Sequence, residues 1–144
     1  MSSFERKLEK INCLIERLKC ESLSDALLVV EGEKDVESLK TIGIEGDILA
    51  IKSGGKNLSE IMDKIISLNK KEIILLMDFD EHGRELTEYL AKTLERMRVK
   101  LNLNFWREFS NLLNNDLKDI EGLARYIETL KRKVEGKHYS DSVW

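Results

Sequence analysis

Hydrophobic residues follow two patterns along the chain, short unbroken runs and longer stretches with helical spacing. The segments 26–30, 47–51 and 73–77 have the length of strands. They are apolar except for Asp47 at the start of the second, and charged residues border the apolar positions. This arrangement is typical of strands that are buried on both faces of a parallel sheet. A fourth segment, 99–104, alternates apolar and polar residues, which predicts a short strand near a sheet edge.

Stretches with helical spacing separate these runs. The apolar positions predict an amphipathic helix over 4–20, helices after each of the first three strands, and two more helices after residue 104. Strands therefore alternate with helices, which implies an α/β fold with a mainly parallel four-stranded sheet and helices on both faces.

We expect residues 1–144 to form a single domain, because a chain of this length can bury a core without disulfides. Within it, 1–25 carries the N-terminal helix and 26–104 forms the α/β core. Residues 105–135 carry the C-terminal helices. Residues 136–144 lack periodicity, which predicts a loose tail.

The composition excludes several classes of protein. A hydrophobic fraction of 42% and a charged fraction of 35% are typical of a soluble globular protein. No segment is apolar for long enough to span a membrane, and the N-terminus lacks the layout of a signal peptide, so we expect a cytoplasmic protein. The net charge of -3 argues against coating nucleic acid by bulk electrostatics, but it leaves room for a local basic surface.

Acidic residues follow the first and third predicted strands. Glu31 follows the first, and Asp78 and Asp80 follow the third. If these two strands lie side by side, with the second strand beyond the first, their carboxyl ends flank the switch point and the three acids meet there. Converging carboxylates repel unless a cation or proton lies between them, which predicts a site for Mg²⁺ or Mn²⁺. The alternative for Asp78 and Asp80 is an ordinary turn and helix cap.

Basic residues and glycines lie near these acids in the sequence. Lys52, Gly54, Gly55 and Lys56 follow the second predicted strand, and Arg84 lies at the start of the helix after Asp80. Paired glycines between a strand and a helix can expose N–H groups to a phosphate, and the lysines add positive charge. A glycine turn with a purely structural purpose is an equally good interpretation of this loop.

Three segments, LLVVEGEKD, IKSGG and IILLMDFDEHG, occur in an order and spacing that resemble the Toprim domain of topoisomerases and bacterial-type primases. The resemblance spans 26–104 and implies a Rossmann-like core. It also implies that Glu31 acts as a general acid/base or metal ligand, and that Asp78 and Asp80 bind Mg²⁺. The glycines of the family match Gly32, Gly55 and Gly83.

The chain is most similar to small stand-alone Toprim proteins such as the maturases that trim 5S ribosomal RNA precursors. Phe79 departs from the common Asp-Pro-Asp form of the motif. The resemblance implies a Mg²⁺-dependent nuclease that acts on structured RNA in preference to DNA. The alternative is a non-catalytic module that binds RNA or DNA within a larger complex, with a protein partner. The sequence does not decide the oligomeric state.

Overall fold

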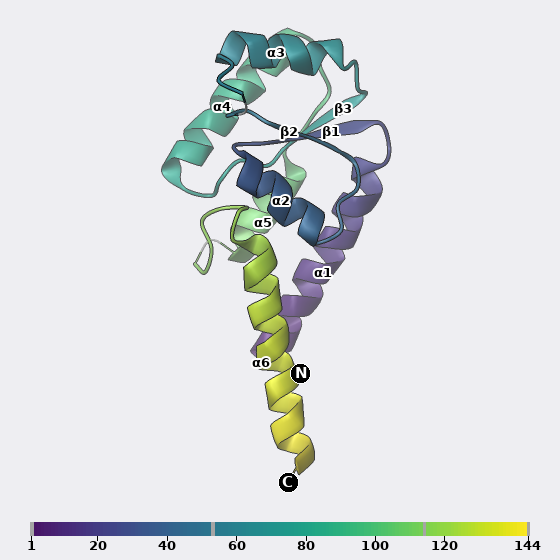
Figure 1. The fold of residues 1–144 in the computed structure, drawn as a ribbon, viewed down its shortest axis with the longest axis vertical. Coiled ribbons are helices and arrows are strands. Elements are labelled where there is room, and N and C mark those ends of the chain that lie inside the picture. Colours follow the sequence, from purple (N-terminus) through teal and green to yellow (C-terminus); the bar gives the residue numbers. More distant parts are fainter. Residues whose placement is uncertain (1, 53, 114, 144) are drawn as a thin grey trace.

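Helices and strands alternate along most of the chain (Figure 1). The computed structural model describes residues 2–52, 54–113 and 115–143, and of 137–143 the backbone alone. The elements are α1 (Ser3–Ser22), β1 (Ala26–Val30), α2 (Glu33–Thr41), β2 (Asp47–Ala50), α3 (Leu58–Ser67), β3 (Glu72–Leu75), α4 (Glu81–Arg96), β4 (Leu101–Asn102), α5 (Asn104–Leu113) and α6 (Leu123–Val143).

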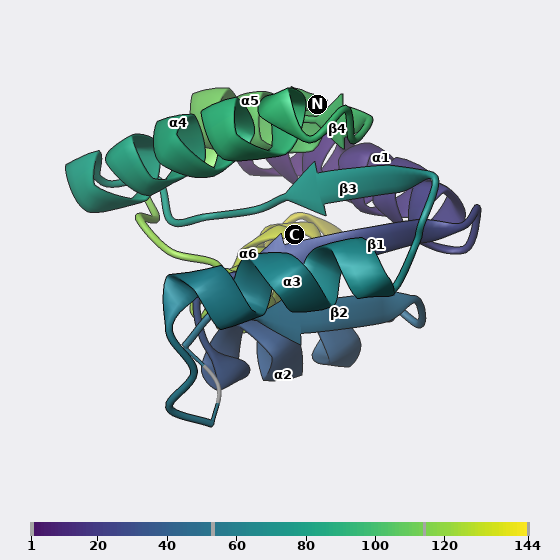
Figure 2. The same cartoon turned by 90° about the horizontal axis from the view of Figure 1, so that it is seen from above.

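A four-stranded sheet lies at the centre, in the order β2-β1-β3-β4, and every pairing in it is parallel (Figure 2). In the middle of β1, Val29 lies opposite Leu49 of β2 and Leu75 of β3. The predicted α/β fold with a mainly parallel sheet is confirmed, and β1 lies between β2 and β3, the condition under which the sequence brings the acids together.

Each face of the sheet has its own hydrophobic core, because successive side chains of a strand point to opposite faces. Leu28 and Ile74 pack with residues of α1, α2, α5 and α6, whereas Leu27 and Ile73 pack with residues of α3 and α4. Figure 1 shows these two groups of helices on opposite sides of the sheet. The prediction that helices cover both faces is confirmed.

The long helix α1 buries its apolar stripe in the first of these cores. Ile11, Leu14 and Leu18 are buried there beside α5 and α6. At the surface, Lys7 pairs with Asp116 at 2.7 Å. Within the described residues, no helix combines the length and the apolar character that crossing a bilayer requires.

Two elements differ from the sequence predictions. The strand β4 has only two residues, because the chain turns into α5 at Asn104, whose N–H donates to the side-chain oxygen of Asn102 at 2.9 Å. Helix α6 continues to Val143, so the backbone of 136–143 is helical where we expected a loose tail.

Replacing Phe109 tests the core beneath the sheet. Phe109 is 0% exposed, so Phe109→Ala is expected to lower the free energy of unfolding by about 3–5 kcal/mol through lost burial and a residual cavity. Urea denaturation measures this loss. The control is Tyr89→Ala, an aromatic residue that is 53% exposed, which is expected to cost less than about 1 kcal/mol. Equal losses in the two variants would contradict the packing described above.

Candidate metal centre

The carboxyl ends of β1 and β3 bring two acids together at one edge of the sheet. Glu31 directly follows β1, and Asp78 lies shortly after β3. The parallel ladder continues past β3, since the Leu76 N–H donates to the Val29 carbonyl oxygen at 2.9 Å. The Asp78 carboxyl therefore reaches the Glu31 carboxyl, and the two groups hydrogen bond when they share a proton. The structure brings together two of the three predicted acids.

Glu31 is buried and Asp78 is half-buried. Glu31 is 6% exposed, and its Oε1 atom has no hydrogen-bond partner among the described residues. Burial, followed by the hydrogen bond to Glu31 and the negative charge of Glu31, raises the pKa of Asp78 to about 7. Asp35, in the first turn of α2, is also buried, and burial raises the pKa of its carboxyl, to which the charges of Asp78 and Asp119 add. The site is therefore electrostatically unfavourable for ionised carboxylates.

Asp80 does not join this pair directly. It is exposed and forms the N-cap of α4, where its Oδ1 atom accepts the Gly83 N–H at 2.7 Å. The helix-cap interpretation of the Asp-x-Asp motif therefore describes Asp80. Across the part of the chain that the structure describes, no three His, Cys, Asp or Glu side chains form a ready-made ligand set. The predicted three-acid cluster is not preassembled.

The residues at this edge nevertheless fit a hard divalent cation. Glu31 and Asp78 supply carboxylate oxygens, and no donor from the described residues reaches the buried Oε1 atom of Glu31. Mg²⁺ is typically bound by one or two carboxylates, and water molecules complete its coordination. A cation between the two carboxylates would also relieve the repulsion that raises the pKa of Asp78.

The glycine-lysine loop begins beside Glu31. The Lys52 N–H donates to the Glu31 carbonyl oxygen at 2.8 Å, which places the start of the loop at the acid pair. Gly54 and Gly55 have φ values of +65° and +67°, which favour glycine, and both lie open to solvent. Lys52, Lys56 and Arg84 are exposed, whereas Ser53 lies outside the described residues. A phosphate-binding role for these residues stays a prediction.

The two glycines that flank the acids differ in their surroundings. A Cβ atom on Gly83 would overlap the carbonyl oxygen of Asp78, so this position has no room for a side chain. A Cβ atom on Gly32 would meet only the Oδ2 atom of Asp35, at an ordinary contact distance of 3.9 Å. Gly83 is thus required for the close approach of α4 to Asp78, and Gly32 is not required by its described neighbours.

The sequence did not predict three residues that touch Asp78 or its neighbour Phe79. They are Trp106, Lys118 and Ile120, which contact this segment through one side-chain and two backbone hydrogen bonds. Asp119 lies in the same loop, and its Oδ1 atom accepts the Gly122 N–H at 2.8 Å in the turn before α6. The acid content of 119–121 is a weak signal for this loop, and nothing near Trp106 in the sequence points to the site.

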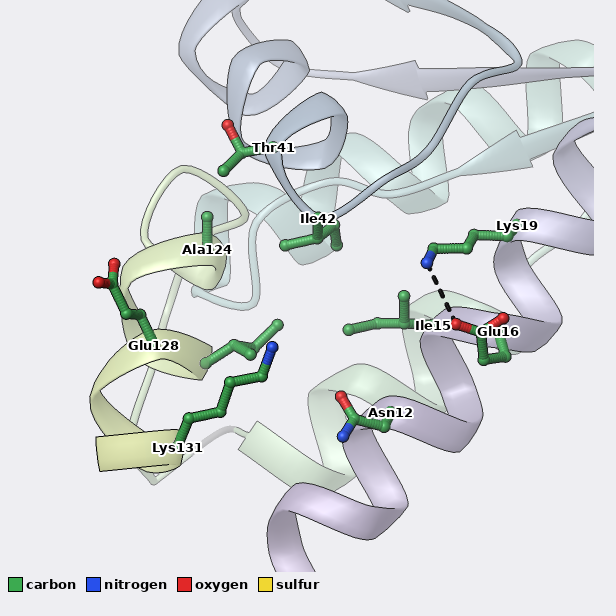
Figure 3. A pocket seen from close by; sticks show the side chains of 10 residues that line it. Asn12, Ile15, Glu16, Lys19, Thr41, Ile42, Ala124, Glu128 and Lys131 are labelled. Atoms are coloured by element: carbon green, nitrogen blue, oxygen red, sulfur yellow. Dashed lines mark hydrogen bonds and ion pairs between the residues drawn. The ribbon is translucent and has the colours of Figure 1, made fainter. Parts of the chain in front are cut away.

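A separate cavity of about 340 Å³ lies between α1, the end of α2 and α6 (Figure 3). Ile42 supplies part of its apolar wall, Lys131 points into it, and Lys19 bonds Glu16 at 3.1 Å on its rim. None of the acids described above lines this cavity. It lies at the end of α2 that is remote from Glu31, so it takes no part in the candidate metal centre.

Comparisons with known proteins agree with this architecture. Residues 26–104 match the model of the Toprim domain. A UPF0292 protein of Methanocaldococcus jannaschii is 36% identical over 124 residues, which cover 86% of this chain and 91% of that protein. A UPF0292 protein of Methanosarcina barkeri is 33% identical over 132 residues, which cover 91% of this chain and 90% of that protein.

A solved structure of a protein from Aquifex aeolicus is similar in fold. It aligns with a TM-score of 0.64 at 24% sequence identity, covering 76% of this chain and 94% of that one. At this identity the likeness shows the shared fold alone.

Substituting Gly83 tests the close approach of α4 to Asp78. Gly83→Ala is expected to lower the free energy of unfolding by about 1–3 kcal/mol, because the new methyl group meets backbone that must shift. Gly136→Ala is the matched control, since nothing lies within 4 Å of its added Cβ in α6. The control is expected to gain about 0.5–1 kcal/mol from higher helix propensity. A stabilised Gly83→Ala variant would disprove the close approach.

The raised pKa of Asp78 predicts how the stability of the metal-free protein depends on pH. The carboxyl titrates near 3.8 when unperturbed and at about 7 in the folded chain, so the folded state binds more protons between these values. Its contribution to stability is complete below about pH 4 and is lost as the pH rises through about 7.

In EDTA, the free energy of unfolding of the wild type is expected to fall by an amount on the order of 1–2 kcal/mol between about pH 5 and about pH 8. Asp78→Asn is expected not to show this fall. Urea denaturation at about pH 5 and about pH 8 measures the difference. An identical pH dependence in the variant would show that Asp78 is not the group responsible.

Proposed function

The chain belongs to the Toprim-domain family and to the UPF0292 proteins, and on this basis we propose that it is a Mg²⁺-dependent nuclease that cleaves phosphodiester bonds in structured RNA. Membership of the Toprim family implies a metal-binding role in nucleic-acid processing. The reaction, the metal and the substrate are our proposal.

One observation carries this proposal. The buried Glu31 carboxyl, whose Oε1 atom has no partner within the part of the chain that the structure describes, lies against Asp78 at the carboxyl edge of a parallel sheet. Strongly perturbed carboxyls at such an edge are frequent at functional sites, because ligands of open α/β sheets bind there. A pair of neighbouring acids in this place favours a cation-binding reaction centre over a purely structural pair.

The acids have distinct roles in the proposed mechanism. Asp78 and Asp80 would hold Mg²⁺, and Glu31 would share the ion or transfer a proton to or from the reacting oxygen. The bound ion supplies polarisation of a phosphate oxygen and neutralises the charge that develops during cleavage. Asp80 can serve as cap and ligand together, since its Oδ1 atom accepts the Gly83 N–H and its Oδ2 atom makes no described hydrogen bond.

Exposed basic residues would bind the phosphates on either side of the cleaved bond. Lys52 follows β2 beside Glu31, and Arg84 lies in the first turn of α4 beside Asp80. With Lys56 and the N–H groups of Gly54 and Gly55, they provide contacts that position the nucleic-acid backbone without reading its sequence.

We assign RNA as the substrate, in preference to DNA, because the chain resembles the small maturases that trim 5S ribosomal RNA precursors. A role in ribosomal RNA processing in the cytoplasm follows from this assignment.

Cleavage of a structured RNA tests the function. The wild type is expected to cut the RNA with Mg²⁺ or Mn²⁺ and not with EDTA, and Glu31→Gln and Asp78→Asn are expected to lose at least about 100-fold in rate. Asp80→Asn preserves a good N-cap, so loss of cleavage at unchanged stability would assign its carboxylate to the metal. Gel analysis of end-labelled RNA measures the rates.

The control is Asp63→Asn, an exposed acid on α3, which is expected to cut like the wild type. Equal rates in all variants would refute the assignment of the acids. RNA or DNA binding with a steep salt dependence, without cleavage under either ion, would favour the non-catalytic binding module instead.

A further inference from the structure

The segment that carries Asp78 lies beyond the end of the sheet. The Leu76 N–H makes a ladder bond to β1, and after it the chain leaves the sheet toward α4. Backbone N–H and C=O groups that leave a sheet in a buried region need other partners. Phe79 is 3% exposed, so its backbone is in such a region.

The peptide unit between Asp78 and Phe79 is held from both sides. The indole N–H of Trp106 donates to the Asp78 carbonyl oxygen at 3.3 Å, and the Phe79 N–H donates to the Lys118 carbonyl oxygen at 2.7 Å. The Ile120 N–H also donates to the Oδ1 atom of Asp78 at 3.4 Å. The short bond from the Phe79 N–H holds the backbone, and the two longer bonds restrain the carbonyl and the carboxyl of Asp78.

All three partners come from outside the Toprim segment 26–104. They are anchored in the core, because Phe105, next to Trp106, is 4% exposed and Ile120 is 0% exposed. Both pack into the core that α1, α2, α5 and α6 form against the sheet. Groups held by close-packed neighbours can restrict Asp78, since they are not free to move with it.

We propose that Trp106, Lys118 and Ile120 form a clamp that positions Asp78 for metal binding, so that the segment after residue 104 is part of the functional site. This proposal rests on the proposed function for the role of Asp78, but the clamp itself is a statement about structure. The three residues are positioning residues, because they act through Asp78.

The clamp also gives a physical reason for Phe79. A proline at this position has no N–H and could not donate to the Lys118 carbonyl oxygen. Phe79 keeps this donor and adds a buried ring to the core. The departure from the Asp-Pro-Asp motif is thus consistent with a site that is held by the C-terminal segment.

Binding of Mn²⁺ without RNA tests the positioning role. Trp106→Phe retains a ring and removes the indole N–H, and it is expected to weaken Mn²⁺ binding about 10-fold, as for other residues that orient metal ligands. Calorimetric titration measures the affinity, and thermal unfolding in EDTA shows whether the fold is retained. The control is Thr93→Val, which removes a side-chain bond to the Tyr89 carbonyl oxygen in α4 and is expected to bind Mn²⁺ like the wild type.

Amide exchange measured by NMR tests the clamp without any metal. In the wild type, the Phe79 amide is expected to exchange at least about 100-fold more slowly than in an unstructured peptide. In Trp106→Phe this protection is expected to fall at least about 10-fold, while the Leu76 amide in the sheet keeps its protection.

An unprotected Phe79 amide in the wild type would overturn the clamp, even if the protein proves to be a nuclease. If Trp106→Phe loses protection of the Phe79 amide but binds Mn²⁺ as tightly as the wild type, the positioning role is refuted. It is also refuted if the exchange rate of the Phe79 amide in Trp106→Phe equals that of the wild type. If the wild type binds no Mn²⁺ at all, the proposed nuclease function and the positioning role both fail, and amide exchange still decides whether the peptide unit is held.

Discussion

The parallel pairing of β1 with both β2 and β3 is the constraint on which the rest of the structure depends. The chain passes from β1 through α2 to β2 on one side, and α3 then returns it to β3 on the other side. Connections of the same hand that run in opposite directions place their helices on opposite faces. The helices α2 and α3 do lie in different cores. The same reversal brings Glu31 and Asp78 to neighbouring strand ends, where ligands of such sheets bind.

The buried acids at the site lower the stability of the folded protein, and the packing of the rest of the fold compensates for this loss. A buried acceptor without a partner costs roughly 1–3 kcal/mol of desolvation. The Oε1 atom of Glu31 is such an acceptor as far as the described residues go. Backbone donors offset part of the cost nearby, since the Gly32 N–H donates to Asp35 at 3.0 Å and the Ile120 N–H donates to Asp78. Among the described residues, no donor reaches the Oε1 atom of Glu31. A bound cation would supply positive charge beside Glu31 and Asp78.

The sequence allowed the alternation of strands and helices to be predicted, because apolar runs and helical spacing are local signals. The meeting of Glu31 with Asp78 was predicted only on the condition that the first strand lies between the second and the third, and the structure has this order. The place of Asp80 was not decidable, since one carboxylate after a strand can cap a helix or bind a metal. The length of β4 was overestimated because the local pattern does not show where the pairing with β3 ends. Alternation over 99–104 shows one exposed face, but the pairing ends where the chain turns into α5.

The contacts from the C-terminal segment could not be predicted, because Trp106 and Ile120 are 28 and 42 residues from Asp78 and have no local pattern that refers to it. Helical spacing does predict that Phe109 is buried, and the same helix carries Trp106 to the site. The residues that fill the core and those that contact Asp78 therefore belong to one folding segment. A substitution that loosens α5 would then disorder the acid pair without touching an acid, because local unfolding of the segment removes both sets of contacts together.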